Sequence, residues 1–395
     1  MPKTVKDLLV EIRNTSELVI DLAYSSVLYD VEDVAEEVLE LEAKFVDLIK
    51  EIRKIAALSV RHIRETEKVA SILQIASAGY KMSSAAGDIS SLVLRGYKLP
   101  KNIVNLILAH SEETIVKVTV PENSPVVGKS LGEVMFQKVT GMRVIAIKRD
   151  LQWIFDVDRD TRIMKGDVLF VRGDPNSVPR LYEFVLNETR EIGIASELEI
   201  PELDRAVDLL IEMKNLSELA VDLAYSSLIY GNEDVALEVV YIESVLDNMK
   251  FEVEKLILSA SKKFDDPSIL IPIIEIVHCS EQIADSAREI AEILLNKMEL
   301  PEVFKDAMRK TGEILIMVNV DKDSPLTNKT LKETRVESNT GMHIIAIKRR
   351  NEWITRPTAS TAIHAGDILI AKGPRESEIE FLNLCCSTKQ AKPAS

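Results

Sequence analysis

The chain has 395 residues, of which 46% are apolar and 29% charged, and its formal net charge is −15. A chain of this length exceeds the size of a single ordinary domain and predicts several. The acidic balance excludes sequence-independent binding of DNA or RNA, and it disfavours attachment to anionic lipid through a polybasic patch.

The first residues, MPKTVKDLLVEIRN, are charged and lack the apolar stretch of a secretory signal. No apolar run approaches the roughly 18 residues that a membrane-spanning helix needs. The three cysteines, Cys279, Cys385 and Cys386, fit neither a disulfide framework nor a zinc-binding spacing. We therefore expect a cytoplasmic protein without a membrane span of its own.

Two segments occur twice. SELVIDLAYSSVLY (16–29) returns as SELAVDLAYSSLIY (217–230), and TGMRVIAIKR (140–149) returns as TGMHIIAIKR (340–349). The two copies are separated by 201 residues for the first segment and by 200 for the second, so the whole unit is duplicated. Two copies are too few for a solenoid. We infer a tandem duplication with internal pseudo-twofold symmetry.

From residue 3 to about 110, apolar residues recur at helical spacing, as in Leu8, Ile12, Leu18 and Leu22. The pattern predicts three long antiparallel helices in each repeat. We expect RETEK (64–68) and FDDPS (264–268) to separate the second helix from the third. Leu99-Pro100 and Leu300-Pro301 should end the third helices, because proline disfavours helix at the preceding residue. A short helix follows each.

After about residue 112 the apolar period becomes two, which predicts strands over 114–120, 141–150 and 153–157, and a turn followed by a buried strand within 165–174. A turn leading into a short helix is expected between the first two strands, and a closing helix over 177–186. The second half repeats this order. Residues 387–395, STKQAKPAS, are expected to be a disordered tail.

The strand-rich segments resemble the TrkA-C domain, the C-terminal lobe of RCK regulators of potassium channels and transporters. The resemblance rests on NSPVVGKSLGE, TGMRVIAIKR and KGDVLFVRG in the first repeat, and on DSPLTNKTLKE, TGMHIIAIKR and AGDILIAKG in the second. The second repeat departs from the pattern at Asn328, where the first has Gly128. The resemblance to the TrkA-C domain covers about 75 residues in each repeat.

The helical segments resemble the PhoU domain, a three-helix bundle of phosphate-uptake regulators that carries Glu/Asp-x-x-x-Asp motifs on its second and third helices. The second repeat has ESVLD and EQIAD, which supply Glu243, Asp247, Glu281 and Asp285. The first repeat keeps Glu42 and departs at Val46, Tyr80 and Ser84, with Asp47 one position off. A PhoU and TrkA-C pairing is typical of archaeal and bacterial proteins related to potassium channels or phosphate uptake.

The PhoU resemblance implies a metal site on the bundle of the second repeat. Carboxylates at i and i+4 share one helix face, and two such pairs could give four oxygen ligands for iron, manganese, magnesium or zinc. The alternative is ordinary acidic residues on solvated helix faces. Two further pairs, Glu17/Asp21 and Glu218/Asp222, could extend an acidic surface; we expect them on the solvent-exposed side of the first helix of each repeat.

Cationic residues end the strand of each IKR motif, at Lys148, Arg149, Lys348 and Arg349. The TrkA-C resemblance implies that such domains pair face to face and that some hold a small anionic ligand, such as a cyclic dinucleotide, between them. Arginine and lysine at that seam could bind phosphates. The alternative, which we favour, is charge that protects a strand edge from aggregation.

The predicted fold class is α and α+β multidomain, with two PhoU-like bundles alternating with two small TrkA-C-like domains. The ranges are 1–111, 112–190, 191–311 and 312–386, followed by the tail. We expect the TrkA-C-like domains to dock on each other and the bundles to form a six-helix pseudo-dimer.

Enzyme activity is not expected, because the five histidines are scattered and the chain lacks G-x-G-x-x-G and P-loop motifs. The leading functional hypothesis is a cytoplasmic, ligand-sensing regulatory subunit of a membrane cation channel or transporter, with potassium as the cation. The alternatives are a PhoU-like regulator of phosphate uptake and a metal-binding protein that uses the second-repeat carboxylates. No nucleic-acid partner is expected.

Overall fold

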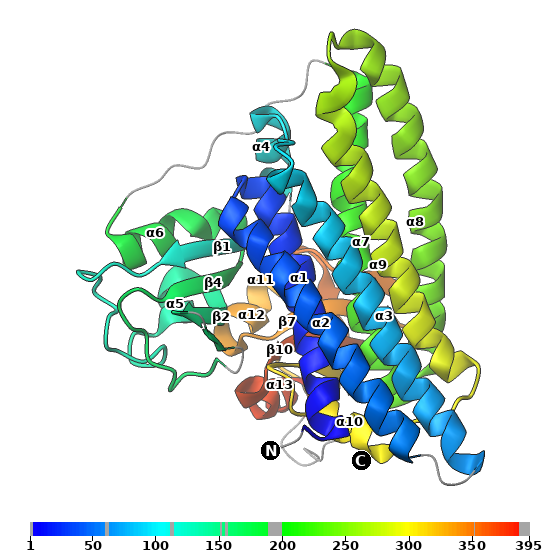
Figure 1. Ribbon diagram of the computed structural model, residues 1–395. Coiled ribbons are helices and arrows are strands. Elements are labelled where there is room, and N and C mark those ends of the chain that lie inside the picture. Colours follow the sequence, from blue (N-terminus) through cyan, green and yellow to red (C-terminus); the bar gives the residue numbers. More distant parts are fainter. Residues whose placement is uncertain are drawn as a thin grey trace.

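The computed structural model describes residues 3–59, 63–110, 114–150, 152–154, 157–188, 200–350 and 352–386. The helices form one tall layer, and the two sheets lie beside its lower half (Figure 1). The expected tail, and part of the predicted third strand, lie outside the described residues. Among those described, no helix is both long and apolar enough to cross a bilayer.

Each repeat begins with three long helices and a short one, as the apolar spacing predicts. In the first repeat these are α1 (Val5–Tyr29), α2 (Glu32–Ser59), α3 (Ile63–Leu94) and α4 (Lys101–His110). In the second they are α7 (Pro201–Tyr230), α8 (Glu233–Ala260), α9 (Ile271–Leu295) and α10 (Glu302–Met308).

One expected break is wrong. RETEK lies inside α3, which already begins at Ile63, because its Glu and Lys residues are good helix formers and no proline or glycine interrupts them. FDDPS does separate α8 from α9. There Asp266 accepts a hydrogen bond from the Ser268 amide, and Pro267 starts a short 3₁₀ turn.

The two three-helix bundles join through α3 and α9. Ser71 donates a hydrogen bond to the Glu299 carbonyl at 2.8 Å, and Lys81 forms an ion pair with Glu289 at 2.5 Å. Deeper in the core, the Tyr24 hydroxyl lies 2.8 Å from the Ser280 hydroxyl of the other bundle. The six helices thus share one apolar core.

Each repeat ends in a four-stranded antiparallel sheet with the same strand order. The first sheet runs β1-β4-β2-β3 and the second β5-β10-β7-β8. The strands of the first are β1 (Thr114–Thr119), β2 (Met142–Arg149), β3 (Gln152–Ile154) and β4 (Val168–Gly173). Those of the second are β5 (Glu313–Asn319), β7 (His343–Arg349), β8 (Glu352–Thr355) and β10 (Ile368–Pro374).

Short helices and a two-stranded ladder complete these domains. They are α5 (Phe136–Thr140) and α6 (Val178–Leu186) in the first, and β6 (Lys329–Thr330), α11 (Leu331–Thr334), α12 (Val336–Thr340), β9 (Ala362–Ile363) and α13 (Glu378–Cys385) in the second. The predicted fold class, helical bundles alternating with α+β domains, is confirmed.

The period of two gives each sheet two buried faces. Ile115, Ala146 and Phe170 point toward the long helices and join their core. Val116, Leu169 and Val171 point the other way, where they pack with residues of α5 and α6. Because one face is committed to the helices, each sheet is held directly against the first helix of its own repeat.

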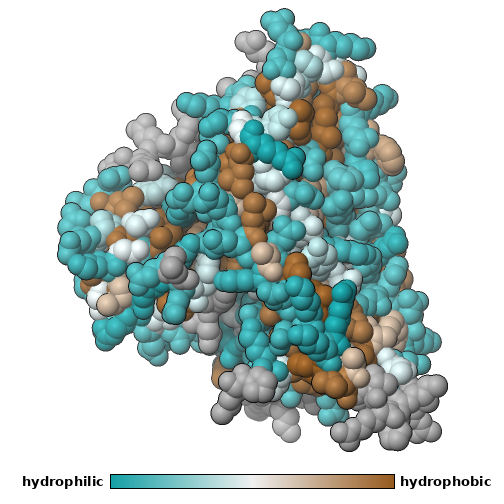
Figure 2. All heavy atoms as spheres, in the orientation of Figure 1, coloured by the Kyte–Doolittle hydropathy of each residue, from teal (hydrophilic) through white to brown (hydrophobic). Residues whose placement is uncertain are grey.

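The outer face of α2 and α3 is mainly hydrophilic, with apolar residues scattered between polar ones (Figure 2). The sheets pack on the opposite side of α1 and α7 from that face (Figure 1). This arrangement buries the contact region between helices and sheets at the centre of the molecule.

Candidate functional site

Four acidic residues of α1 and α7 are not on the solvent-exposed side, and that expectation is wrong. Asp222 is 7% exposed, and the side chains of Glu17 and Asp21 are each 12% exposed. Glu218 is the most accessible of the four and pairs with Lys214 at 2.8 Å. The sheets cover this side of the helices, because the acidic surface of α1 faces β4 and that of α7 faces β10.

Cations from the sheets meet these acids in equivalent positions of the two repeats. Arg172 of β4 forms an ion pair with Asp21 of α1. Lys372 of β10 donates to both oxygens of Asp222 on α7, at 3.0 and 3.3 Å. Each contact ties a sheet to the first helix of its own repeat.

Glu313, the first residue of β5, connects the two halves. Its Oε1 accepts from Arg143 at 2.7 Å, and its Oε2 accepts from Arg172 at 3.0 Å. Lys372 lies 3.5 Å from the same carboxylate. The two strand-rich domains therefore dock on each other through one carboxylate of the second and two arginines of the first.

These contacts form a single buried group, which we call the central ion-pair cluster. Arg13 of α1, fully buried, completes it by donating from Nε to Glu17 at 3.0 Å. Four cations thus face four carboxylates, so the cluster is electrically balanced. Its members are Arg13, Glu17, Asp21, Arg143, Arg172, Asp222, Glu313 and Lys372.

The cluster favours the charged forms of Glu313 and Lys372, whereas burial raises the pKa of Asp222 despite its contact with Lys372. Burial disfavours ionisation of Glu313, but Arg143, Arg172 and Lys372 outweigh it and hold the pKa of that carboxyl well below its usual range. Burial also disfavours the charged Lys372 ammonium, yet Asp222, Glu17 and Glu313 raise its pKa. A buried charge of this kind is tolerated only while its partners stay in place.

A cavity of about 140 Å³ lies next to the cluster. Equivalent residues of the two repeats line it, so it lies on the pseudo-twofold axis between the two strand-rich domains. Three such pairs are Gln137 with Glu337, Gly141 with Gly341, and Arg143 with His343. A typical small-molecule pocket is ~300–1,000 Å³, so a ligand of drug size would require the two domains to separate.

Two of the four second-repeat carboxylates predicted as metal ligands, Glu243 and Glu281, form ion pairs with cationic side chains. Glu243 accepts from Arg288 at 2.8 Å, and Glu281 accepts from Lys250 at 2.9 Å. Burial, followed by hydrogen bonding with Asp285, raises the pKa of Glu243. Within the described ranges, no three acidic, histidine or cysteine side chains form a group suited to a metal ion. As arranged here, Glu243, Asp247, Glu281 and Asp285 do not fit the four-oxygen set.

The first repeat treats these two ion pairs differently. Glu281 and Lys250 are both replaced, by Tyr80 and Ile49. The Glu243–Arg288 pair loses only its cation, because Glu42 remains whereas Gly87 replaces Arg288. A metal site in the second repeat stays a prediction, and it would require Arg288 to leave Glu243.

The IKR residues predicted to line the seam lie elsewhere. Lys148 pairs with Glu37 of α2 at 2.5 Å, and Lys348 pairs with Asp234 of α8. Each lysine therefore fastens a sheet to a helix of its own repeat. They do not line the cavity, because the IKR end of each strand points toward the second helix of the bundle.

Arg149 and Arg349 each fix a turn within their own domain. Arg149 donates from Nε and Nη2 to Asp167 at 2.8 and 2.9 Å, and Arg349 makes the same two bonds to Asp367 at 3.0 and 2.8 Å. Both aspartates are buried. The structure thus gives these arginines an intradomain role.

Sequence reasoning missed the residues that do lie at the seam. A usable signal was present: Arg13 and Lys214 precede Glu17 and Glu218 by four residues, a spacing that favours ion pairs on a helix. Arg172 and Lys372 are also cations at equivalent positions inside otherwise apolar strands. A charge placed in a buried strand in both repeats requires a buried partner.

The chain matches two domain families. Residues 115–186 and 315–385 match the TrkA-C domain, and residues 210–294 match the PhoU domain. A curated relative, Potassium channel protein 1 of Methanocaldococcus jannaschii, is 32% identical over 88 residues, which are 22% of this chain and 26% of that protein. The Ammonium/H(+) antiporter subunit AmhM of Alkalihalophilus pseudofirmus is 19% identical over 106 residues, 27% of this chain and 64% of that protein.

The chain therefore spans about a quarter of one curated relative and less than two thirds of the other. Among solved structures, PhoU from Pseudomonas aeruginosa is 12% identical with a TM-score of 0.39, over 74% of this chain and 96% of that one. The GsuK channel bound to NAD is 12% identical with a TM-score of 0.20, over 81% of this chain and 65% of that one.

Proposed function

We propose that this chain, which carries two TrkA-C domains and a PhoU domain, is a regulatory protein of cation transport, with potassium as the transported ion. The TrkA-C matches carry the proposal, supported by relatives named as a potassium channel and an antiporter subunit. The protein would act from the cytoplasm on a separate membrane partner. Its role would be binding and regulation rather than catalysis.

The central ion-pair cluster supplies a mechanism for such regulation. The cluster joins both TrkA-C domains to α1 and α7, so the two sheets cannot move relative to the helices without separating buried charges. A ligand that binds the separated arrangement more tightly would shift the population toward it. The change would reach both bundles at once, because Glu313 contacts Arg143 and Arg172 of the other TrkA-C domain.

The ligand we propose is a small anion bound on the pseudo-twofold axis between the TrkA-C domains. We place its candidate residues at the cavity instead of at the IKR ends, because Arg143, His343 and Arg172 line that cavity. A thermal-shift screen of nucleotides and cyclic dinucleotides tests this. A hit should weaken in Arg143→Ala and persist in Lys348→Ala; a hit lost only in Lys348→Ala would contradict the new placement.

The transport role is tested by reconstitution. A candidate potassium channel or transporter from the same genome is placed in proteoliposomes, and potassium flux is measured with and without this protein. We expect the protein to change the flux, and Glu313→Gln to alter that change while binding to the partner is retained. Binding without any effect on flux would refute the proposal.

A second candidate is a regulator of phosphate uptake, which the PhoU match of residues 210–294 supports. The two candidates differ in the ion whose uptake changes. Deleting the gene should alter growth at limiting potassium under the first proposal and growth at limiting phosphate under the second. A phosphate phenotype with normal potassium growth would favour the second.

A further inference from the structure

The outer face of α8 carries a stripe of exposed apolar side chains. Leu237, Tyr241, Phe251 and Leu258 are 56%, 62%, 66% and 67% exposed. The exposed positions follow spacings of four and three residues, the spacing of a coiled-coil seam. The full stripe is Leu237, Tyr241, Ser244, Asn248, Phe251, Lys255 and Leu258.

This stripe is not required for α8 to pack in its own bundle. The opposite face of α8 buries a complete apolar set against α7 and α9, which includes Val239, Leu246 and Val253. Figure 1 places α8 at the outer edge of the helical layer, away from both sheets. Helix α8 therefore has two apolar faces, of which the structure covers one.

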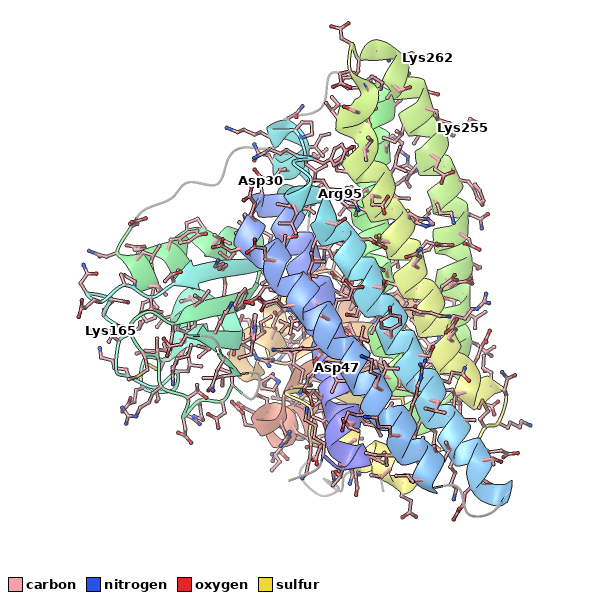
Figure 3. All side chains as sticks on the ribbon, in the orientation of Figure 1. Asp30, Asp47, Arg95, Lys165, Lys255 and Lys262 are labelled. Atoms are coloured by element: carbon pink, nitrogen blue, oxygen red, sulfur yellow. The ribbon has the colours of Figure 1, made fainter. Side chains whose placement is uncertain are left out.

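The first repeat provides an internal comparison. At the equivalent positions of α2 the residues are Glu36, Glu40, Lys50 and Ala57, and all four are exposed. Figure 3 shows Asp47 on this polar face of α2 and Lys255 at the outer edge of α8. The second helix of the bundle therefore has a polar outer face in the first repeat and an apolar outer face in the second. The apolar stripe is a property of α8 and not of the fold.

We propose that α8 packs antiparallel against α8 of a second copy of this chain, around a twofold axis near the middle of the stripe. The stripe spans 22 residues, about 32 Å of helix. Its four apolar side chains expose on the order of 400 Å² in each copy, about half of what one partner contributes to a standard interface. The polar residues beside the stripe would supply the rest.

Charge along α8 selects the antiparallel arrangement. Its beginning is acidic, with Glu233, Asp234 and Glu238. Its end and the turn that follows, residues 250–263, are net basic, because lysines at 250, 255, 262 and 263 outnumber Glu252 and Glu254. Antiparallel packing places the acidic beginning of one helix against the basic end of the other. It also opposes the two helix dipoles favourably. Parallel packing would instead bring like charges together, which is destabilising.

The oligomeric state in solution tests the proposal. We expect the full chain to run at twice its 44.2 kDa in light scattering at tens of micromolar. The variant Leu237→Glu/Tyr241→Glu/Phe251→Lys/Leu258→Ala gives α8 the residues that α2 already carries on its exposed face, so it should fold. It should raise the dissociation constant at least about tenfold. Leu58→Glu, at an exposed apolar residue of α2, is the control and should remain dimeric.

Orientation is tested by cross-linking. Asn248→Cys lies near the centre of the stripe and should form a disulfide-linked dimer in a Cys386→Ser background, since Cys279 and Cys385 are buried. Leu258→Cys lies near one end and should not link to itself. A monomeric wild-type protein, an unchanged mass for the quadruple variant, or linkage through Leu258→Cys alone would each overturn the proposal.

Discussion

Replacing Glu313 with glutamine should destabilise the contact between the two TrkA-C domains. Glutamine keeps the shape of the side chain but removes the charge that Arg143, Arg172 and Lys372 share. Breaking a buried ion pair costs about 3–5 kcal/mol, because the remaining charge stays buried. The side chains of Glu313 and its three cationic partners are 13–19% exposed, so water partly screens their charges. We therefore expect the free energy of unfolding to fall by about 2–3 kcal/mol.

The assay is urea unfolding followed by tryptophan fluorescence, since the chain has two tryptophans, Trp153 and Trp353, one in each TrkA-C domain. The control is Glu122→Gln, which breaks an exposed pair with Lys165 and should change stability by less than about 1 kcal/mol. A double-mutant cycle with Arg143→Met should give a coupling above about 1 kcal/mol. Equal losses for Glu313→Gln and Glu122→Gln would refute the reasoning.

Two further predictions concern pH and the IKR motifs. The pKa of Glu313 is lower in the folded state than the value of about 4.3 in the unfolded state, so its ionised form stabilises the protein above that pH and this contribution is lost as pH falls further. The difference in free energy of unfolding between wild type and Glu313→Gln should therefore be constant from about pH 8 to 5 and shrink below that range. A difference that instead grows on acidification would show the opposite sign. Arg149→Ala and Arg349→Ala should each lower the free energy of unfolding by about 2 kcal/mol, because each leaves a buried aspartate without its arginine. Lys348→Ala should cost less than Lys148→Ala, since its partner Asp234 is exposed whereas Glu37 is buried; urea unfolding of the four variants checks both statements.

The sequence predicts the architecture well because it repeats. The duplicated segments, the change of period near residue 112, and the proline that follows Leu99 predict the order of helices and strands that the structure shows. RETEK continues α3 instead of ending a helix, because charged residues alone do not end one. Good helix formers continue it unless a proline or glycine intervenes.

The central ion-pair cluster could not be located in the same way. Helical periodicity shows which residues face the bundle core, but it cannot show that a sheet covers another side of the same helix. Glu17 and Asp222 therefore had the pattern of surface residues. Their burial depends on strands that come more than a hundred residues later in the chain, at Arg172 and Lys372.

The two repeats differ where their surroundings differ. Both repeats have an ion pair between the sheet and the first helix, Arg172–Asp21 in the first repeat and Lys372–Asp222 in the second, because each sheet must be held against the first helix of its own repeat. The pair Glu243–Arg288 occurs only in the second repeat, and so does the apolar stripe of α8. A homodimer of single repeats would carry every surface twice. A duplicated chain can keep one outer helix polar and make the other apolar, so it presents one self-pairing face per molecule, and assembly through that face closes at two copies instead of continuing as a filament.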